Sequence, residues 1–405
     1  MMFWNDPIHF IETWFVDLFT TWGLSLQLAT ILVYAIGIIV LVVFAMVLDI
    51  FLVWVERKVV ARFQDRLGPN RIGPFGLIQP FADIIKMVIK EDITPVGADK
   101  VLFNIAPVLA AMSVIILWAI LPLASTIYGV DLNVAVLYLI AAGSLGTLAI
   151  IIAGWSSNNK YALLGAFRMV ANMVSYEIPM VIILLIPTIL ADTMSVRGIT
   201  DAQSGMWFFF LSPLAFLIFL VSAIAELGRS PFDLNEAESE IVAGFHIEYT
   251  GMKFGWFYAG ELLHAFTFGG FMAILFFGGY GGFFGLEELP AFQWLTIPFI
   301  QAAVFITKAM LGYWVIMWVK YSMPRIRIDH MLAFNWKFLV PLSLVVLVNT
   351  AFVNRILAGA SDWVYVLIMF GSNLVIAVVV VEILRAVGRR DRKAVATGIP
   401  AGNPE

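Results

Sequence analysis

The sequence has no cysteine and only 4 histidines. The lack of cysteine excludes disulfides, cysteine-ligated zinc and every cysteine-ligated iron–sulfur cluster. Among the histidines, which are His9, His246, His264 and His330, only His264 lies well inside an apolar segment. The histidines therefore offer neither the pair that a bis-histidine haem needs nor a metal-ligand spacing. We expect no metal site and no redox centre on this chain.

Charged residues are also scarce. They make up 13% of the 405 residues, whereas hydrophobic residues make up 61% and the mean hydropathy is +0.94. Soluble domains contain about 25% charged residues, so this composition indicates a polytopic membrane protein. Residues 1–24 contain Asp6, Glu12 and Asp17 but no lysine or arginine, and we therefore expect no cleavable signal peptide. The sequence shows no internal repeat.

Nine apolar segments are long enough to cross a membrane. They predict an all-α polytopic membrane protein with about nine transmembrane helices and additional amphipathic helices in the membrane interface. The segments are 28–55, 101–126, 133–154, 162–190, 207–228, 256–283, 294–319, 336–354 and 363–386.

Two further stretches carry apolar residues at helical spacing but are not expected to span. Aromatic residues recur over 10–22, which favours an interfacial helix over a loose N-terminal tail. Apolar residues over 77–89 repeat at i, i+3 and i+4, with Asp83, Lys86 and Lys90 off the stripe. This second helix would either lie on lipid or form a wall of a chamber for an amphiphilic ligand, and the pattern leaves both interpretations open.

The positions of the basic residues set the expected orientation. Outside the spans, every one of the 24 lysines and arginines except Arg197 and Arg355 falls on one side, and Lys308 lies within a span. The positive-inside rule makes that side cytoplasmic. We predict one transmembrane domain over 1–386, with the N-terminus outside and large cytoplasmic loops at 56–100 and 229–255. Residues 387–405 would form a disordered cytoplasmic tail.

The stretch from Glu226 to Glu261 is unusually acidic for a chain this apolar. Against two bases, Arg229 and Lys253, it holds seven acids: Glu226, Asp233, Glu236, Glu238, Glu240, Glu248 and Glu261. A carboxylate in or near hydrocarbon is costly as an anion, and neighbouring acids resist joint ionisation. Such a group can therefore bind and release protons near neutral pH. Some of these acids could instead complement the N-terminus of a helix.

Other ionisable residues lie at membrane depth. Asp49 and Glu177 fall within predicted spans, Glu261 and His264 share a helix face, and Lys308 lies mid-span. Each charge at the centre of a helix costs about 2.5–3.5 kcal/mol on insertion scales. The alternative to a role in proton movement is a polar contact that only fixes helix packing. For Asp49 and Lys308 the sequence favours neither interpretation. The acids Glu177, Glu226 and Glu261 recur in three separate spans, which favours proton movement.

Four long motifs carry a resemblance to a known family. They occupy Trp54 to Pro95, which contains RLGPNRIGPFG, Gly154 to Glu177, Ala225 to Gly251, which contains SPFDLNEAESE, and Pro324 to Lys337. In this order they resemble the motifs of the quinone-chamber membrane subunit of proton-pumping NADH:quinone oxidoreductase, respiratory complex I. The resemblance covers about residues 30–350.

The resemblance implies a role for each matching residue. The lining of a quinone chamber would comprise Glu56, Arg57, Arg62, Arg66, Arg71, Gln79, Asp83, Lys86, Phe232 and Asp233. The carboxylates that couple quinone chemistry to proton pumping would be Glu177, Glu226, Glu236, Glu238, Glu240, Glu248 and Glu261.

The resemblance further implies an isoprenoid quinone as substrate and no covalently bound cofactor. NADH, FMN and iron–sulfur clusters would belong to partner subunits, namely those of the peripheral arm at the quinone site. Other partners would be the pump subunits of the membrane arm and membrane lipid, but not nucleic acid. The location would be the plasma or inner membrane. Two alternatives stay open: a proton-coupled transporter, which would show inverted repeats with broken helices, and the related membrane subunit of an energy-converting hydrogenase.

Overall fold

The structure, a computed structural model, describes residues 6–233, 241–281, 284–285, 289–357 and 362–396. Within these ranges every regular element is a helix, and eight helices are long and apolar enough to cross a membrane. They are α3 (Leu26–Phe63), α5 (Lys100–Leu117), α6 (Ala135–Ser156), α7 (Lys160–Ala191), α12 (Gly251–Phe276), α13 (Pro298–Ser322), α15 (Val340–Ile356) with the residues before it, and α16 (Asp362–Ala396). The prediction of an all-α polytopic membrane protein is confirmed.

The predicted span at 207–228 is divided into two helices. The short α9 (Phe208–Leu211) ends at Ser212, whose backbone is not helical, and α10 (Pro213–Glu226) begins at the proline. A residue before proline is disfavoured in the helical region, and proline suits the first position of a helix. The 14 residues of α10 rise about 21 Å. Among the described residues, the predicted nine spans therefore correspond to eight long helices and one shorter apolar helix.

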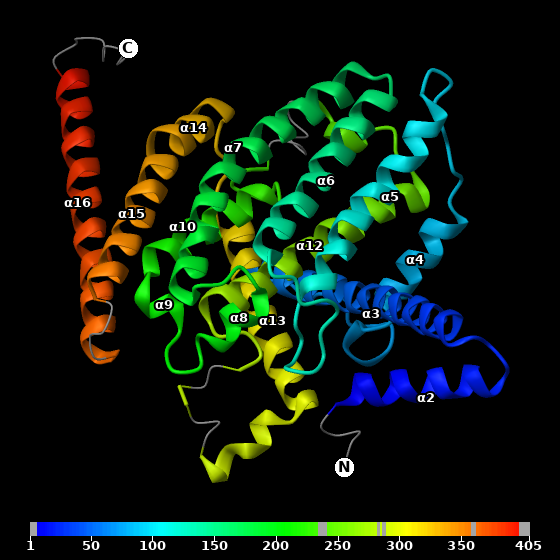
Figure 1. Cartoon of the computed structure of the whole chain (residues 1–405). Helices are drawn as coiled ribbons and strands as arrows, with labels where there is room; N and C mark the ends of the chain where they lie inside the picture. Colours follow the sequence, from blue (N-terminus) through cyan, green and yellow to red (C-terminus); the bar gives the residue numbers. More distant parts are fainter. Residues whose placement is uncertain (1–5, 234–240, 282–283, 286–288, 358–361, 397–405) are drawn as a thin grey trace.

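Helix α12 forms the centre of the bundle (Figure 1). In its most apolar stretch 83% of the residues are buried, against 11% in α3 and in α16. It meets α13 at very short range, since a Cβ on Gly269 would come within 2.5 Å of the carbonyl oxygen of Ala309. Glycine permits this approach of two backbones. The two charged residues of α12, Lys253 and Glu261, are partly buried.

Helix α3 crosses the other long helices at a steep angle, and α2 (Pro7–Thr21) lies beside it (Figure 1). The loop after α3 leads through a short 3₁₀ turn, Pro74–Gly76, to α4 (Gln79–Ile89). Gly76 has a φ of +79°, and a Cβ there would lie 2.2 Å from the carbonyl oxygen of Pro69. Only glycine fits, and it folds the loop back on itself. The helices expected at 10–22 and 77–89 are both present.

The C-terminal segment differs from the prediction. We predicted a disordered tail from residue 387, but α16 continues to Ala396. Arginine, lysine and alanine, which are frequent in residues 387–396, are strong helix formers. The apolar span also supplies the helix nucleus, so propagation costs little. Residues 397–405 lie outside the described ranges.

Candidate functional site: a row of buried charges

A fully buried arginine, Arg229, lies directly after α10. Its side chain is 1% exposed, and it joins carboxylates from two other helices. Its Nη1 lies 3.6 Å from Oε1 of Glu56 on α3, and its Nε lies 3.1 Å from Oε1 of Glu261 on α12. Burial alone would lower the pKa of Arg229, but the carboxylates of Glu261 and Glu56 outweigh burial and raise that pKa above its ordinary value.

Glu56 is held by several other groups as well. Its Oε1 lies 3.0 Å from the ammonium of Lys320 and 2.5 Å from the hydroxyl of Tyr321, both at the end of α13. Its Oε2 accepts a longer hydrogen bond of 3.4 Å from Tyr258 on α12. The buried residues of α3 explain why Glu56 points inward: Ala45, Asp49, Leu52 and Glu56 recur at the spacing of one helix face.

A cavity of about 920 Å³ opens beside Glu56, and we call it the loop cavity. Five residues predicted from the sequence line it: Glu56, Arg57, Arg66, Arg71 and Gln79. The remaining lining comes from α3, from the loop after it and from α12 and α13: Val60, Leu67, Gly68, Pro69, Asn70, Tyr258, Lys320 and Tyr321. The cavity thus combines a cationic rim with one buried carboxylate.

The other residues predicted for the quinone chamber do not line the loop cavity. Asp83 on α4 pairs with Arg57, and its other oxygen lies 3.9 Å from the ammonium of Lys86. The Arg57–Asp83 pair ties α4 to α3. Arg62 and Lys86 are exposed. Arg62 comes six residues after Glu56 and five after Arg57, which places it on a different side of α3 from these two lining residues.

Phe232 and Asp233 act at the junction of two loops. The ring of Phe232 packs at 5.0 Å from that of Tyr176 on α7, and it is buried. Asp233 pairs with Arg325 at 3.0 Å, and the backbone N–H of Ile326 donates to the carbonyl of Pro231 at 3.0 Å. These contacts hold the acidic loop on the basic segment before α14 (Ile328–Phe334).

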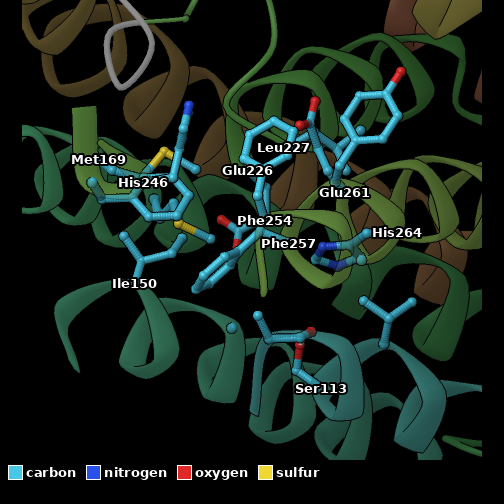
Figure 2. A pocket seen from close by; sticks show the side chains of 17 residues that line it. Ser113, Ile150, Met169, Glu226, Leu227, His246, Phe254, Phe257, Glu261 and His264 are labelled. Atoms are coloured by element: carbon cyan, nitrogen blue, oxygen red, sulfur yellow. Dashed lines mark hydrogen bonds between the residues drawn. The ribbon is translucent and has the colours of Figure 1, made fainter. Parts of the chain in front are cut away.

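A second cavity, of about 90 Å³, continues from Glu261 toward Glu226, and we call it the central cavity. Figure 2 shows the side chains of Glu226, Glu261 and His264 around it, with His246 and Met169 on another side. His246 belongs to the turn Gly244–His246, outside the spans, and burial lowers its pKa below the ordinary value of 6.5 although Glu261 and Asp233 act in the opposite direction.

A third, much smaller cavity of about 10 Å³ lies between Glu226 and Glu177, and we call it the inner cavity. Glu226 is 4% exposed, and one of its carboxylate oxygens has no hydrogen-bond partner among the described residues. Glu177 belongs to α7, two residues before Pro179. The three cavities and Arg229 therefore place Glu56, Glu261, Glu226 and Glu177 in one row.

Among the described residues, one predicted coupling carboxylate, Glu248, lies off this row. Glu248 accepts a hydrogen bond of 2.7 Å from the side chain of Asn159, the residue that caps the start of α7. This contact fastens the acidic loop to α7. Glu236, Glu238 and Glu240 lie outside the described residues.

Sequence reasoning missed four residues of the row's surroundings: Arg229, Tyr258, Lys320 and Tyr321. Arg229 was counted only as a loop base, although it follows a buried helix end and precedes a proline. The other three carry no distinguishing local pattern, because their position at Glu56 arises from the packing of α12 and α13 on α3.

Two intramembrane ionisable residues lie off the row. The ammonium of Lys308 on α13 donates to the backbone carbonyls of Phe277 and Gly281 at 2.9 and 2.6 Å. It thereby binds carbonyls at the end of α12, which favours a role in packing. Asp49 on α3 is 7% exposed, and its Oδ1 has no hydrogen-bond partner in the part of the chain that the structure describes.

Long apolar helices around a row of buried and partly buried carboxylates define this chain as a multi-pass membrane protein with an internal polar path. The sequence profile of the NADH dehydrogenase family matches residues 36–351. The chain therefore belongs to that family, and the resemblance noted in the four motifs is confirmed.

Several curated relatives share most of their length with this chain. The H subunit of the NADH-quinone oxidoreductase of Dehalococcoides mccartyi strain CBDB1 is 47% identical over 315 residues, which cover 78% of this chain and 85% of the relative. An H subunit of the same enzyme from Geobacter metallireducens is 42% identical over 312 residues, covering 75% and 91% respectively. The H subunit from Geobacillus kaustophilus is 44% identical over 300 residues, covering 74% and 87%.

Proposed function

We propose that this chain is the membrane subunit of a proton-translocating NADH:quinone oxidoreductase that forms part of the quinone-binding chamber. It couples quinone reduction to proton movement through its buried carboxylates and carries no redox centre of its own. The names of its relatives, each the H subunit of an NADH-quinone oxidoreductase, support this function over that of the hydrogenase relative.

The observation that carries the proposal is the position of the loop cavity at the first carboxylate of the row. Its volume of about 920 Å³ lies within the ordinary range of ligand pockets. Arg57, Arg71 and Gln79 supply hydrogen-bond donors for the two carbonyl oxygens of a quinone ring, and Val60 and Leu67 supply apolar surface. This combination suits a flat ring with polar oxygens at opposite ends.

Quinone reduction then acts on the row by charge. Two electrons added to the ring leave negative charge until two protons arrive, and that charge lies beside Glu56. It competes with Glu56 and Glu261 for the positive charge of Arg229, which lies between them. A carboxylate that loses part of its cationic partner binds protons more readily. Protons would therefore move along Glu261, Glu226 and Glu177.

Partner subunits complete the enzyme in this proposal. Peripheral-arm subunits carry NADH, FMN and iron–sulfur clusters and close the quinone site, and membrane-arm subunits carry the pumps. The chain lies in the plasma or inner membrane as one domain over 1–386, with the N-terminus outside, the loops 56–100 and 229–255 in the cytoplasm, and a cytoplasmic C-terminus. Glu236, Glu238, Glu240 and Glu248 extend the set of coupling carboxylates toward the cytoplasm.

The test is purification of the intact membrane complex through a tag on this chain, followed by an assay of inhibitor-sensitive NADH:quinone activity. We expect flavin and iron–sulfur signals to co-purify with that activity.

Arg71→Met, which removes a charged donor from the loop cavity, should raise the KM for quinone roughly 10-fold, since such a hydrogen bond contributes about 1.5–3 kcal/mol.

The matched control is Arg355→Met, which removes an exposed arginine at the end of α15. It should leave the quinone KM unchanged. A complex without NADH activity, or an equal response of the two variants, would contradict the proposed quinone site.

A further inference from the structure

Two side chains join the central and inner cavities. Glu226 and His264 are the only described residues that line both. Glu261 lines the central cavity alone, and Glu177 lines the inner cavity alone. A proton that travels between Glu261 and Glu177 must therefore pass the pair Glu226 and His264. Figure 2 shows His264 next to Glu261, on the same side of the central cavity.

The packing of α12 places the imidazole at this point. His264 follows Glu261 by three residues on α12, so the two side chains share a helix face. The ring stacks on Phe268 with centroids 4.9 Å apart, which fixes its plane. Its Nε2 is enclosed and has no hydrogen-bond partner within the described protein. A buried polar nitrogen normally has a partner, so this atom is available for proton exchange.

Imidazole chemistry suits the position better than a packing role does. A neutral imidazole carries a donor on one nitrogen and an acceptor on the other. The ring can accept a proton at one nitrogen and release the proton of the other, after which rotation or exchange restores the first tautomer. The inner cavity, at about 10 Å³, has room for at most one water. Transfer through it needs a protein group at its mouth.

We propose that His264 relays protons between Glu261 in the central cavity and the pair Glu226 and Glu177 at the inner cavity. In each transfer the carboxyl of Glu261 loses a proton to one imidazole nitrogen. The other nitrogen gives its proton to the carboxylate of Glu226, so one O–H bond breaks, another forms, and no electrons move. The relay rests on the proposed function, because it serves the same row of carboxylates.

The charged and titratable groups around the imidazole are consistent with this direction of transfer. Glu226 of α10 and Glu177 of α7 lie on one side, Glu261, Tyr258 and His246 lie around the central cavity, and Arg229 acts on the ring electrostatically. The described residues that α5 and α6 contribute to the two cavities are not titratable.

The experiment compares His264→Asn with His330→Asn in the intact complex reconstituted into proteoliposomes. Asparagine keeps a polar side chain but cannot pass a proton from one atom to another. A positioned proton-transfer group contributes roughly 10²–10⁴-fold, and Glu226 offers a parallel path. We therefore expect about a 10-fold loss in coupled turnover for His264→Asn at unchanged quinone KM. His330 is exposed, and its variant should behave as the unmodified complex.

A second variant separates proton transfer from packing. His264→Ala should lose the same activity and recover part of it when free imidazole is added, a rescue that a packing role would not show. If the His264→Asn complex fails to assemble, the imidazole rescue of His264→Ala tests the relay in its place. Unchanged turnover and pumping in His264→Asn, or an alanine variant that imidazole does not restore, would overturn the relay.

The variant Glu226→Gln distinguishes a failure of the His264 relay from a failure of the proposed function. Impaired pumping in Glu226→Gln with normal pumping in His264→Asn would overturn the relay only. Normal pumping in Glu226→Gln with an impaired, imidazole-rescued His264→Ala would overturn Glu226 as the acceptor and as a member of the row, and would leave His264 transferring directly to Glu177, which lines the same inner cavity.

Discussion

Replacing the buried Arg229 with methionine should isolate the contribution of its two ion pairs to the stability of the fold. In Arg229→Met the apolar stem is kept, but the ion pairs at 3.1 Å with Glu261 and 3.6 Å with Glu56 are lost. At an effective dielectric constant of about 20, each pair gains about 5 kcal/mol in Coulomb energy. Burial of the guanidinium costs several kcal/mol in return.

The net effect depends on the carboxylates left behind. Glu56 keeps Lys320 at 3.0 Å, whereas Glu261 loses the one cationic partner it has among the described residues. Breaking a buried pair from one side costs about 3–5 kcal/mol. Because the side chain of Glu261 is 28% exposed, we expect the lower end, about 3 kcal/mol.

The assay is the temperature at which the intact complex loses NADH:quinone activity in detergent. A loss of about 3 kcal/mol should lower that temperature by on the order of 5 °C. Arg229→Met with Glu261→Gln should recover most of the loss, because the unpaired carboxylate is then absent. Arg355→Met, which replaces an exposed arginine, should change nothing. If Arg229→Met matched the unmodified complex, or if the double variant were less stable still, the reasoning would be refuted.

Three further changes have defined outcomes. Lys308→Met removes charged hydrogen bonds to two carbonyls at the end of α12 and should lower stability by about 2 kcal/mol, measured as the same inactivation temperature, while pumping per NADH stays constant. Arg57→Met breaks a half-exposed ion pair with Asp83; stability should change by less than about 1 kcal/mol, whereas the quinone KM, measured by steady-state kinetics, should rise. Burial lowers the pKa of His246 below 6.5 in the folded chain, so the unfolded chain binds more protons and stability is lost as pH falls below 6.5. In His246→Asn, thermal scans should show a smaller loss of stability as pH falls below 6.5. An unchanged loss would mean that other groups cause it.

Periodicity and composition were sufficient for most of the fold. The apolar runs located the long helices because a helix that crosses hydrocarbon must satisfy its backbone internally and present apolar side chains. The stripe over 77–89 located α4 because its apolar residues fall on one helix face. The break between α9 and α10 was missed because Ser212 and Pro213 lie within an otherwise continuous apolar run.

The site was predicted only in part. Glu226, Glu261 and Glu177 could be proposed because acids in apolar segments are costly, whereas Glu56 was implied by the family resemblance as a chamber residue. The structure brings the four into one row. The buried position of Arg229 could not be predicted, because a basic residue in a polar loop has the same local sequence pattern whether it is exposed or buried. Its burial follows from tertiary packing of α3 and α12 around the end of α10, which no single segment specifies.

The roles of the charged residues in the first loop show the same limit. Glu56 and Arg57 are adjacent in sequence, yet one is enclosed at the row and the other pairs with α4. Arg62 and Lys86 carry the same charge as the lining residues Arg66 and Arg71 but do not line the loop cavity. Which basic side chains reach the cavity depends on the turn at Gly76, whose positive φ directs the loop back over α3.

In the proposed function, carboxylates inside the bundle couple quinone reduction to proton movement, and the proton yield of Glu226→Gln is the decisive measurement of that coupling. The intact complex would be reconstituted in proteoliposomes, and protons translocated per NADH oxidised would be measured together with the turnover rate. Glu226 is enclosed between the central and inner cavities, so we expect a turnover about 10-fold lower or a reduced proton yield. An unmodified rate with an unmodified proton yield would contradict it.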